Sequence, residues 1–587
     1  MGFTRRDLLK FSGGSAAGLV FTPVPWSLLH DTALWSENWP GIPQPPQGEV
    51  RTRYTTCTLC PAGCGVRARC AGDQPVSLSG VPGHPASRGA LCAAGLVGHH
   101  LAFCRDRARE PLAHGHPVAI ERALAAVTAA IAACGPRETV ALFDPRPGRA
   151  ASFVYRRFLS GLPNAVHCAP ADAQPCGPFG VDLENTRAIL SFGTPVLDGW
   201  LSPGRVLANR SHLRLIQVEA AYSRTASLAD VWVPVVPGGE DAFAEAVARA
   251  LQGGGADERA AEAARLLLQN KPAIALGGGA AVAKLNAILG SVGQPGGFLP
   301  RRDFTPATDI ATVPDGSIRV LLIEEGSGGR PLSWDLVQRK LVPQNPLVVA
   351  LTPWLDGCAQ HADYIIPAPV YLESLDEAAT PAGSVAAGFS LSPALLASPG
   401  KLTPPAEFVL RLAQDSASYA DVLKDRVTAI RKEGRGSIFT YADAKSTRVA
   451  EIASAADLWK AMLGGAVWLD DRLPAATNLR PGALPAPESV ELTPAYPLIL
   501  IAADDPPAHA SPLMSKLYRE SGLRRPANAA IVHPKTGRGQ GLQDGCRAIV
   551  SSPSGTFTVQ TIFDPAVMPG VIEVAGRTPS AASIRRA

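Results

Sequence analysis

The chain has 587 residues, a length that predicts about three to five domains. Hydrophobic residues make up 46% and charged residues 18%, which excludes a disordered protein. The net charge is +4 and no long basic run occurs, so nucleic acid is excluded as the expected partner. The 56 glycines and 54 prolines predict many tight turns and short elements rather than a helical bundle.

The N-terminal segment, residues 1–35, has the features of an export signal. Arg5 and Arg6 are adjacent and precede a short, weakly apolar stretch at residues 11–21. This stretch is too short to span a bilayer, which takes about 20 residues. A cationic start before a short apolar core is typical of a secretory signal, and the arginine pair resembles a bacterial twin-arginine signal. We therefore expect export by the twin-arginine route to the periplasmic or extracytoplasmic side of the membrane.

A short strand is expected at residues 50–56, ahead of the first cysteine motif. Through the middle of the chain, apolar runs alternate with alanine-rich runs. The expected strands are residues 139–143, 188–192, 213–218, 273–276, 319–323 and 347–351, and the expected helices are residues 118–133, 241–251, 257–269 and 405–414. This alternation predicts α/β domains with parallel sheets, in which ligands bind at the carboxyl ends of the strands. From residue 548 onward, short strands with Pro/Gly turns predict a small β-barrel.

Four cysteines form the sharpest chemical motif, with the spacing C-x2-C-x3-C-x27-C: Cys57, Cys60, Cys64 and Cys92. Gly63, just before the third cysteine, can take a positive φ at little cost and let the loop turn. Four thiolates suit a [4Fe–4S] cluster or a four-cysteine zinc site. Disulfides are a third option in an exported protein, but three cysteines within eight residues are crowded for ordinary bridges. The spacing favours a metal and does not separate iron from zinc.

The cysteine spacing resembles the N-terminal cluster motif of the molybdopterin oxidoreductase family, the dimethyl sulfoxide reductase superfamily. Other segments are similar to the family in the same order, at residues 107–112, 188–193, 222–242, 361–373 and 496–571. The resemblance covers about residues 50–400 and 495–578. It implies a multi-domain α/β architecture with an iron–sulfur domain at residues 50–112, interleaved α/β domains at 113–415, an unassigned insertion or linker at 416–490, and a pterin-dinucleotide-binding-like β-barrel at 491–580.

The resemblance also implies a function. The chain would be an exported iron–sulfur oxidoreductase subunit that passes electrons through a [4Fe–4S] cluster, between a pterin–metal centre or a partner subunit and a respiratory chain. The implied cofactor is molybdopterin guanine dinucleotide with molybdenum or tungsten. The implied partners are a ferredoxin-like iron–sulfur subunit and a membrane anchor, which reach a quinone or cytochrome pool. A zinc-stabilised exported binding protein is the hypothesis from a different class.

Several positions depart from the family pattern. The basic residue that follows the fourth cysteine in the family corresponds to Ala94, which has neither charge nor donor. Asp172 falls nearest the family's metal-ligand loop, with Cys168 and Cys176 close by, and is the candidate catalytic ligand; a loop aspartate without a ligand role is the alternative.

The nucleotide contacts also differ from the family at residues 218–222 and 376–383, whereas Ser511 and Asn528 in the C-terminal block remain as candidate cofactor-binding residues. A fold can outlast its cofactor. The alternative function is therefore a non-catalytic electron-transfer or scaffold subunit of a membrane-associated respiratory complex that has lost molybdenum.

Overall fold

The computed structural model describes residues 48–104, 107–170, 176–200, 202–301, 303–325, 332–381, 383–397, 400–472, 489–502, 528–574, 577 and 579–587. The predicted signal segment, Asp172 and Ser511 lie outside these residues. No helix within the described ranges is both long and apolar enough to cross a membrane.

The cysteine motif begins on a three-stranded antiparallel sheet. Its strands, in order, are β1 (Val50–Thr56), β2 (Gly65–Ala71) and β3 (Gln74–Gly80). β1 has the bounds that the sequence predicts. Its last residue, Thr56, pairs with Gly65 at the start of β2, so residues 57–64 form the loop of a β-hairpin. This hairpin therefore holds three of the four cysteines in one tight turn.

The large sheet has the strand order β14-β7-β6-β15-β16-β17-β4-β5. Its bounds are β14 (Thr308–Asp309), β7 (Ala165–Ala169), β6 (Thr139–Phe143), β15 (Ile318–Glu324), β16 (Leu347–Thr352), β17 (Tyr364–Pro367), β4 (Leu112–Ala113) and β5 (His116–Pro117). β6 is parallel to β7 on one side and to β15 on the other, so the chain changes direction across the sheet between β6 and β15. Ligands of parallel α/β sheets bind at such a crossover, beyond the carboxyl ends of the strands.

Helices cover both faces of the large sheet. Val140 and Leu142 of β6 pack in one core, whereas Ala141 and Phe143 pack in another on the opposite face. The covering helices are α4 (Ile120–Ala132), α5 (Ala150–Ser160), α12 (Pro405–Leu412) and α13 (Tyr419–Glu433) on the first side and α11 (Trp334–Lys340) on the second. A strand that is buried on both faces reads as a continuous apolar run, which is why the bounds of β6 agree with the sequence prediction.

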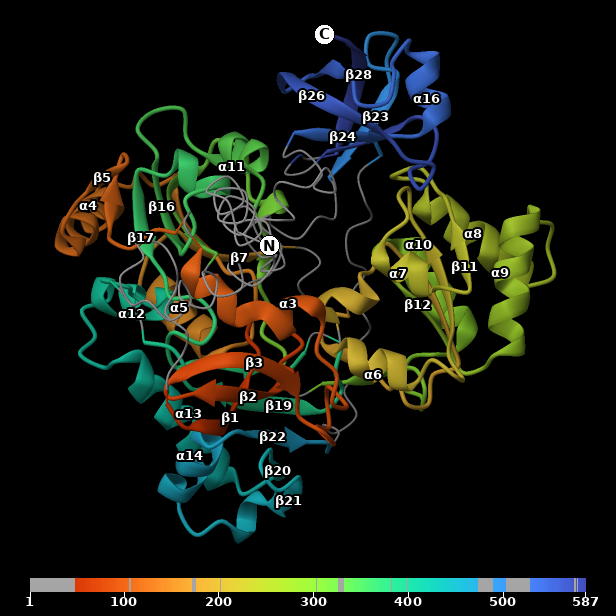
Figure 1. Cartoon of the computed structure of the whole chain (residues 1–587). Helices are drawn as coiled ribbons and strands as arrows, with labels where there is room; N and C mark the ends of the chain where they lie inside the picture. The colour runs from red at the N-terminus through yellow and green to blue at the C-terminus, as the bar shows by residue number, and fades with distance from the viewer. Residues whose placement is uncertain are drawn as a thin grey trace, which may run out of the picture.

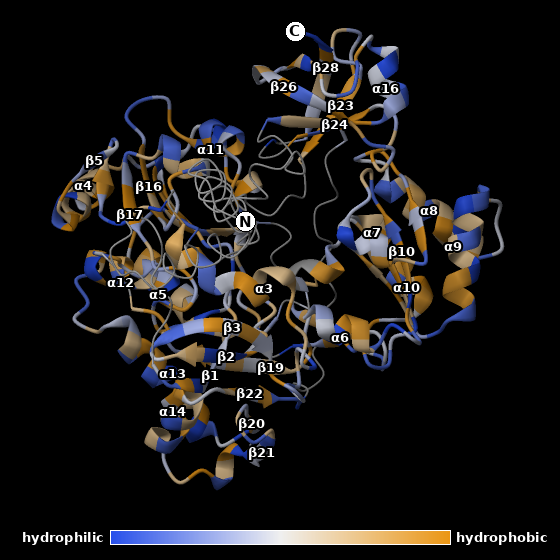
Figure 2. Cartoon of the chain, in the orientation of Figure 1, coloured by the Kyte–Doolittle hydropathy of each residue, from blue (hydrophilic) through white to orange (hydrophobic). Residues whose placement is uncertain are grey.

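A second, smaller parallel sheet has the order β11-β10-β9-β12. Its elements are β9 (Ala188–Phe192), β10 (Arg214–Val218), β11 (Val231–Val233) and β12 (Ala273–Leu276), with α8 (Glu240–Leu251), α9 (Glu258–Gln269) and α10 (Ala280–Leu289) packed against it. Figure 2 shows apolar colouring along β10, while α8 and α9 beside it carry both apolar and polar turns. Together with the large sheet and the C-terminal barrel, this sheet confirms the predicted multi-domain α/β architecture.

Residues that the sequence left unassigned, 416–490, form regular structure in their described part. The helices α13 and α14 (Ala455–Leu463) accompany a sheet of order β18-β19-β22-β20-β21. Its strands are β18 (Asp376–Ala379), β19 (Ala387–Ser392), β22 (Ala466–Asp470), β20 (Ser437–Thr440) and β21 (Lys445–Arg448). This sheet lies next to β1 and β2 in Figure 1, and a buried hydrogen-bond contact of 3.2 Å joins Thr55 Oγ1 of β1 to Ser392 Oγ of β19. From the segment itself, the Tyr441 hydroxyl lies 2.9 Å from Thr56 Oγ1 at the end of β1, so the segment also contacts the cysteine hairpin.

The C-terminal strands form a closed barrel of order β23-β27-β24-β26-β25-β28. They are β23 (Leu498–Ala502), β24 (Ala529–Val532), β25 (Arg547–Ser552), β26 (Gly555–Phe563), β27 (Val571–Val574) and β28 (Ser580–Arg586). An antiparallel bridge between Ala221 and Val567 joins the barrel to the smaller α/β layer. In Figure 1 the barrel lies at the opposite end of the molecule from β1, β2 and β3.

Candidate metal centre

The hairpin loop brings its three cysteines to one side of the sheet. The backbone N–H of Cys57 donates to the carbonyl of Cys64 at 2.8 Å, which closes the neck of the loop. Gly63 has φ +58°, the left-handed conformation that the turn was expected to need. Cys57 and Cys64 are buried, at 5% and 6% exposure, whereas Cys60 is partly exposed. A backbone hydrogen bond thus closes the loop that carries two buried cysteines and one partly exposed cysteine.

The fourth cysteine comes from the start of a short helix. Cys92 is the N-cap of α3 (Ala93–Val97), and its Sγ accepts a hydrogen bond from the N–H of Gly95 at 3.5 Å. A Cβ added to Gly95 would lie 3.8 Å from Cys57 Sγ, so α3 packs directly on the hairpin loop. Cys64 Sγ lies 3.6 Å from the hydroxyl of Ser202, at the start of α6 (Pro203–Ala208).

The four thiols share one environment. Burial raises the pKa of Cys57 well above its ordinary value, and the neighbouring Cys60, Cys64 and Cys92 raise it further. Burial, Cys60 and Cys92 likewise raise the pKa of Cys64 to about 12, against a hydrogen bond from Ser202. Four thiolates this close together repel one another, and a bound metal removes that penalty because it replaces the protons.

Within the described ranges, no three His, Cys, Asp or Glu side chains lie close enough to hold a single metal ion. This spacing is compatible with a cubane cluster, in which each thiolate binds a different iron and stands farther from its neighbours than the ligands of one zinc ion. Cys168 and Cys176 are not paired with each other, since neither forms a disulfide.

A buried tyrosine completes the wall of the cage. The Tyr371 hydroxyl has no hydrogen-bond partner in the described structure, and the ring packs so tightly on Gly98 that an added Cβ would lie 2.8 Å from Cδ1. Burial raises the pKa of Tyr371, and the thiols of Cys57 and Cys64 raise it further. An unpaired donor buried among thiols is costly in the protein alone and can donate to a bound cluster.

The loop that carries Tyr371 is fixed by a buried ion pair. Arg107 donates through both terminal nitrogens to the two carboxylate oxygens of Glu373, each at 2.7 Å. Both side chains are at most 1% exposed. Arg107 also donates to the carbonyl of Ala102 at 3.1 Å, next to the cysteine helix α3. The two residues belong to separate segments of the family resemblance, and the structure joins them.

A second buried network occupies the crossover between β6 and β15. Arg149 pairs with Asp144, just beyond β6, at 2.8 Å and with Glu324, the last residue of β15. Asp144 also accepts from the Ser152 hydroxyl at 2.5 Å and contacts His167 Nε2 at 3.1 Å. Burial alone would raise the pKa of Asp144, but the Arg149 guanidinium and His167 hold it well below its usual range.

The N-terminus of α5, which follows β6 directly, is occupied by a carboxylate. Glu377 Oε1 accepts from the N–H of Ala151 at 3.0 Å and from the Tyr419 hydroxyl at 2.8 Å, and Glu377 is fully buried. The N–H groups of Gly148 and Arg149 donate to the Ser152 hydroxyl, each at 3.2 Å. The N–H groups at the start of such a helix form the usual binding site for a phosphate.

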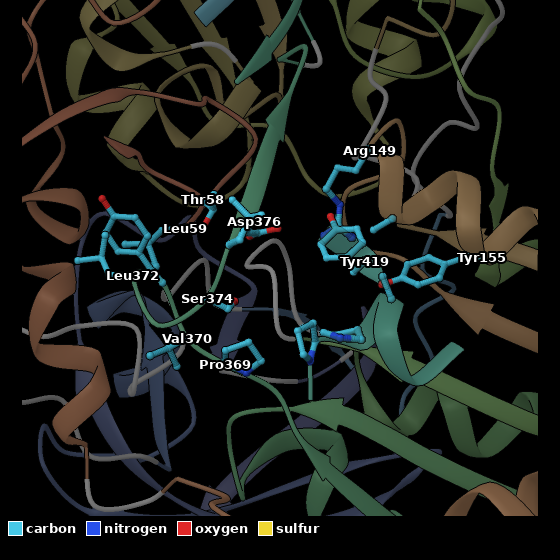
Figure 3. Close-up of a pocket in the computed structure, with 16 residues that line it drawn as sticks. Thr58, Leu59, Arg149, Tyr155, Pro369, Val370, Leu372, Ser374, Asp376 and Tyr419 are labelled. Carbon is cyan, nitrogen blue, oxygen red and sulfur yellow. The ribbon is translucent and has the colours of Figure 1, made fainter. Parts of the chain in front are cut away.

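The space that remains beside this network is small. A cavity of about 40 Å³ lies between the crossover and the cysteine loop, with Thr58 and Leu59 among its lining residues. Figure 3 shows Arg149 and Tyr419 on one side of it, and Asp376 and Thr58 on the other. The smaller sheet shows the same preference for acidic groups, since a Cβ on Gly279, before α10, would lie 2.0 Å from Asp241 Oδ1.

The residues predicted from the sequence are only partly brought together. The four motif cysteines act on one another in one cage, and Ala94 lies in α3, two residues after Cys92. Asn528 precedes β24 in the barrel, where its exposed side chain donates to the carbonyl of Thr558 at 3.5 Å, and β24 lies far from the cage in Figure 1. The roles assigned to Asp172 and Ser511 stay predictions, because both lie outside the described ranges.

Sequence reasoning missed the network around Arg149, Asp144, Glu324 and Glu377. One signal was available: Asp144-Pro-Arg-Pro-Gly-Arg149 follows a buried strand directly, and in a parallel sheet such turns carry ligand or site residues. The carboxylate partners of Arg149 and α5 could not be read from that segment.

A four-thiol cage beside a parallel-sheet crossover defines the class as a metal-binding α/β protein whose thiols suit an iron–sulfur cluster. Residues 50–102 match the model of the molybdopterin oxidoreductase Fe4S4 domain. Over 97% of its length, the chain is 26% identical to the menaquinone reductase, molybdopterin-binding-like subunit, of Nitratidesulfovibrio vulgaris, and it covers 92% of that protein. Over 34% of its length it is 27% identical to one subunit of the sulfite dehydrogenase of Allochromatium vinosum, covering 24% of that protein.

The fold is similar to that of acetylene hydratase from Pelobacter acetylenicus, with a TM-score of 0.61 and 16% identity over 89% of this chain and 93% of that one. These matches support the molybdopterin oxidoreductase family for this chain, and residues 50–102 match the family's Fe4S4 domain. The match favours iron over the zinc alternative that the cysteine spacing had left open.

Proposed function

We propose that this chain is the cluster-bearing, molybdenum-free subunit of an exported, membrane-associated respiratory oxidoreductase. It carries electrons through a [4Fe–4S] cluster at Cys57, Cys60, Cys64 and Cys92, between a ferredoxin-like iron–sulfur partner and a quinone pool reached through a membrane anchor. The observation that carries the proposal is the occupation of the β6–β15 crossover by the chain's own acidic side chains, Asp144, Glu324 and Glu377.

A pterin dinucleotide is polyanionic and needs cations and free N–H groups at its phosphates. At the crossover Arg149 is neutralised by two carboxylates, and Glu377 takes the N–H of Ala151 at the start of α5. The cavity of about 40 Å³ has room for a few water molecules. At Arg149 and the start of α5, the residues present do not fit a phosphate of a pterin dinucleotide, and we assign no step to that group.

The remaining parts of the proposal have separate support. The relative that matches along nearly the whole chain is named as a molybdopterin-binding-like subunit of menaquinone reductase, which supports a quinone-linked role and partner subunits. The Arg5-Arg6 pair and the short apolar stretch after it support export by the twin-arginine route.

A molybdenum-containing oxidoreductase is the second candidate. It is favoured by the partial match to the thiosulfate reductase molybdopterin-containing subunit of Salmonella typhimurium, 24% identical over 33% of this chain and 28% of that protein. In that case Asp172 is the candidate metal ligand.

Metal content separates the two candidates. The complex is purified anaerobically from the exported pool of its native host, and iron, molybdenum, tungsten and zinc are quantified per chain. We expect about four irons in this chain and no molybdenum or tungsten. Molybdenum or tungsten near one per chain would establish the second candidate instead, and zinc without iron would overturn both. A complex that carries Cys60→Ser serves as the blank. Its iron belongs to the partner subunits and is subtracted from the iron of the unmodified complex.

Export is tested apart from the cofactor. In the Arg5→Lys/Arg6→Lys variant, the chain should accumulate in the cytoplasm, because the twin-arginine pathway reads the arginine pair. The control is Arg51→Lys, an exposed change on β1. Export of the double variant at the unmodified rate would contradict the assigned route.

A further inference from the structure

One buried cation near the cysteine loop is not explained by the crossover network. Arg146 lies in the turn between β6 and α5, and its side chain is 4% exposed. Its Nε and Nη2 have no hydrogen-bond partner among the described residues. The nearest carboxylate oxygen paired with it belongs to Asp376, at 3.8 Å. A buried guanidinium with unsatisfied donors is costly unless a partner of opposite charge meets it.

The backbone of Arg146 is held on both sides. Its N–H donates to Asp144 Oδ1 at 3.0 Å, and its carbonyl accepts from Arg149 Nε at 3.0 Å. The crossover network therefore fixes the backbone of the turn, and the Arg146 guanidinium stays within electrostatic range of Arg149 and Glu324. Because the backbone is held on both sides, the side chain starts from a fixed position.

The Arg146 side chain faces the cysteine loop. It lines a cavity of about 30 Å³ together with Pro61, the residue after Cys60, and with Ala378 and Ala379. Burial lowers the pKa of Arg146, as does Arg149, whereas Asp376, Glu324 and Cys60 raise it. Cys60 is thus close enough for its thiolate charge to act on the guanidinium. A four-thiolate cluster carries net negative charge, and each added electron makes it more negative.

We propose that Arg146 is the cation of the cluster site, a positioning residue that faces the Cys60 side of the bound cluster and stabilises its reduced state. This inference rests on the proposed function, since it requires the cluster. Arg146 supplies from the β6–α5 turn a charge that Ala94, beside the fourth cysteine, cannot provide. The electron that reduces the cluster comes from the partner redox subunit, and charge and solvent exposure near a cluster are known to set its potential.

The test is a redox titration of the intact complex, followed by the electron paramagnetic resonance signal of this cluster. At a fixed potential near the wild-type midpoint, Arg146→Gln should lower the ratio of reduced to oxidised cluster about tenfold, which is a shift of about 59 mV for a one-electron couple. Arg146→Lys should recover most of that shift. Asp376→Asn should move the midpoint in the opposite direction, because it removes a negative charge beside Arg146. The control is Arg67→Gln, an exposed change on β2.

The outcomes are distinguishable. A lower midpoint in Arg146→Gln with four irons retained supports the assignment, and an unchanged midpoint overturns it while leaving the cluster intact. If Arg146→Gln does not accumulate, Asp376→Asn decides, because Asp376 is 24% exposed and its change is isosteric; a midpoint that does not rise overturns the assignment. A wild-type chain without iron would overturn the proposed function and this inference together.

Discussion

The cysteine loop and the β6–β15 crossover are neighbouring buried regions with opposite electrostatics. At the cage, the three thiols of the loop lie near Cys92 of α3, and burial and mutual repulsion raise the pKa of Cys57 and Cys64. At the crossover, Arg149 is paired with Asp144 and Glu324, and α5 begins on Glu377. The cage is costly without a ligand, whereas the charge of Arg149 at the crossover is neutralised within the chain.

This difference separates a region that a ligand would complete from a region whose main charges already pair within the chain. The cage is marked by thiols with raised pKa values and by the Tyr371 hydroxyl, which has no hydrogen-bond partner among the described residues. The crossover is marked by the pairing of Arg149 with Asp144 and Glu324, where removal of one partner of a buried pair costs about 3–5 kcal/mol. The comparison is sharpened by changes that should affect only one of the two regions.

The largest effect is expected in the loop. Cys60→Ser removes one thiolate of the cage, so iron should fall from about four per chain to nearly none, and absorbance near 400 nm, about where Fe–S charge transfer lies, should disappear. Metal analysis and visible spectroscopy measure both. The matched control is Cys134→Ser, which changes a free thiol at the end of α4, far from the cage. Full iron content in the Cys60→Ser chain would disprove the cage.

The next effect belongs to the crossover. Arg149→Met leaves Asp144 and Glu324 as buried charges without their shared cation, which should lower the free energy of unfolding by about 3–5 kcal/mol. The control is Arg157→Met: Arg157 is 49% exposed and pairs with Asp415 at the surface, so its loss should cost less than about 1 kcal/mol. Denaturant titration of both variants measures the difference, and equal losses would mean that the crossover network is not structural.

The sequence predicts one of these regions better than the other, for a physical reason. The cage is local: three cysteines fall within eight residues, and Gly63 supplies the turn. The strands β6, β9 and β12 agree with their predicted bounds because strands buried on both faces are continuous apolar runs. The hydrophobic pattern therefore predicts the fold class, and the spacing of the cysteines predicts the cage.

The crossover depends on partners that are distant in the chain. Arg149 and Glu324 are 175 residues apart, and Ala151 and Glu377 are 226 residues apart. No local sequence pattern pairs these residues. The sequence therefore shows that the nucleotide contacts differ from those of the family, but it does not show which residues replace them. The same holds for residues 416–490, because β20 and β22 become strands by pairing with each other and, through β22, with β19, which the chain forms much earlier.

A third prediction concerns pH and the crossover's outer edge. Burial raises the pKa of Glu325 from 4.5 to about 7; the N–H of Leu332 opposes this shift, and the negative charges of Asp356 and Glu324 add to it. The folded chain therefore binds more protons than the unfolded chain between these pH values, so stability should fall as pH rises from about 4.5 to 7, by up to about 3 kcal/mol. Glu325→Gln should remove this part of the pH dependence, and the exposed change Glu258→Gln should not. The free energy of unfolding is measured at several pH values for the unmodified chain and both variants. The same dependence on pH in all three chains would contradict the prediction.

The smallest predicted effect returns to the loop and tests whether its unpaired donor serves the cluster. Tyr371→Phe removes one hydroxyl and keeps the ring that packs on Gly98, so folding should be retained. If the hydroxyl donates to the cluster's thiolate ligand at Cys57, its loss costs the reduced state about 0.5–1.5 kcal/mol, and the ratio of reduced to oxidised cluster should fall about two- to tenfold at a fixed potential.

The matched control, Tyr222→Phe, changes an exposed ring near the barrel and should leave the midpoint unchanged. A titration in which Tyr371→Phe raises the midpoint would show that the hydroxyl disfavours the reduced cluster. Both residues are buried, so added salt should change neither shift of the midpoint strongly. The larger shift should remain that of Arg146→Gln, because Arg146 carries a full charge and the Tyr371 hydroxyl is neutral.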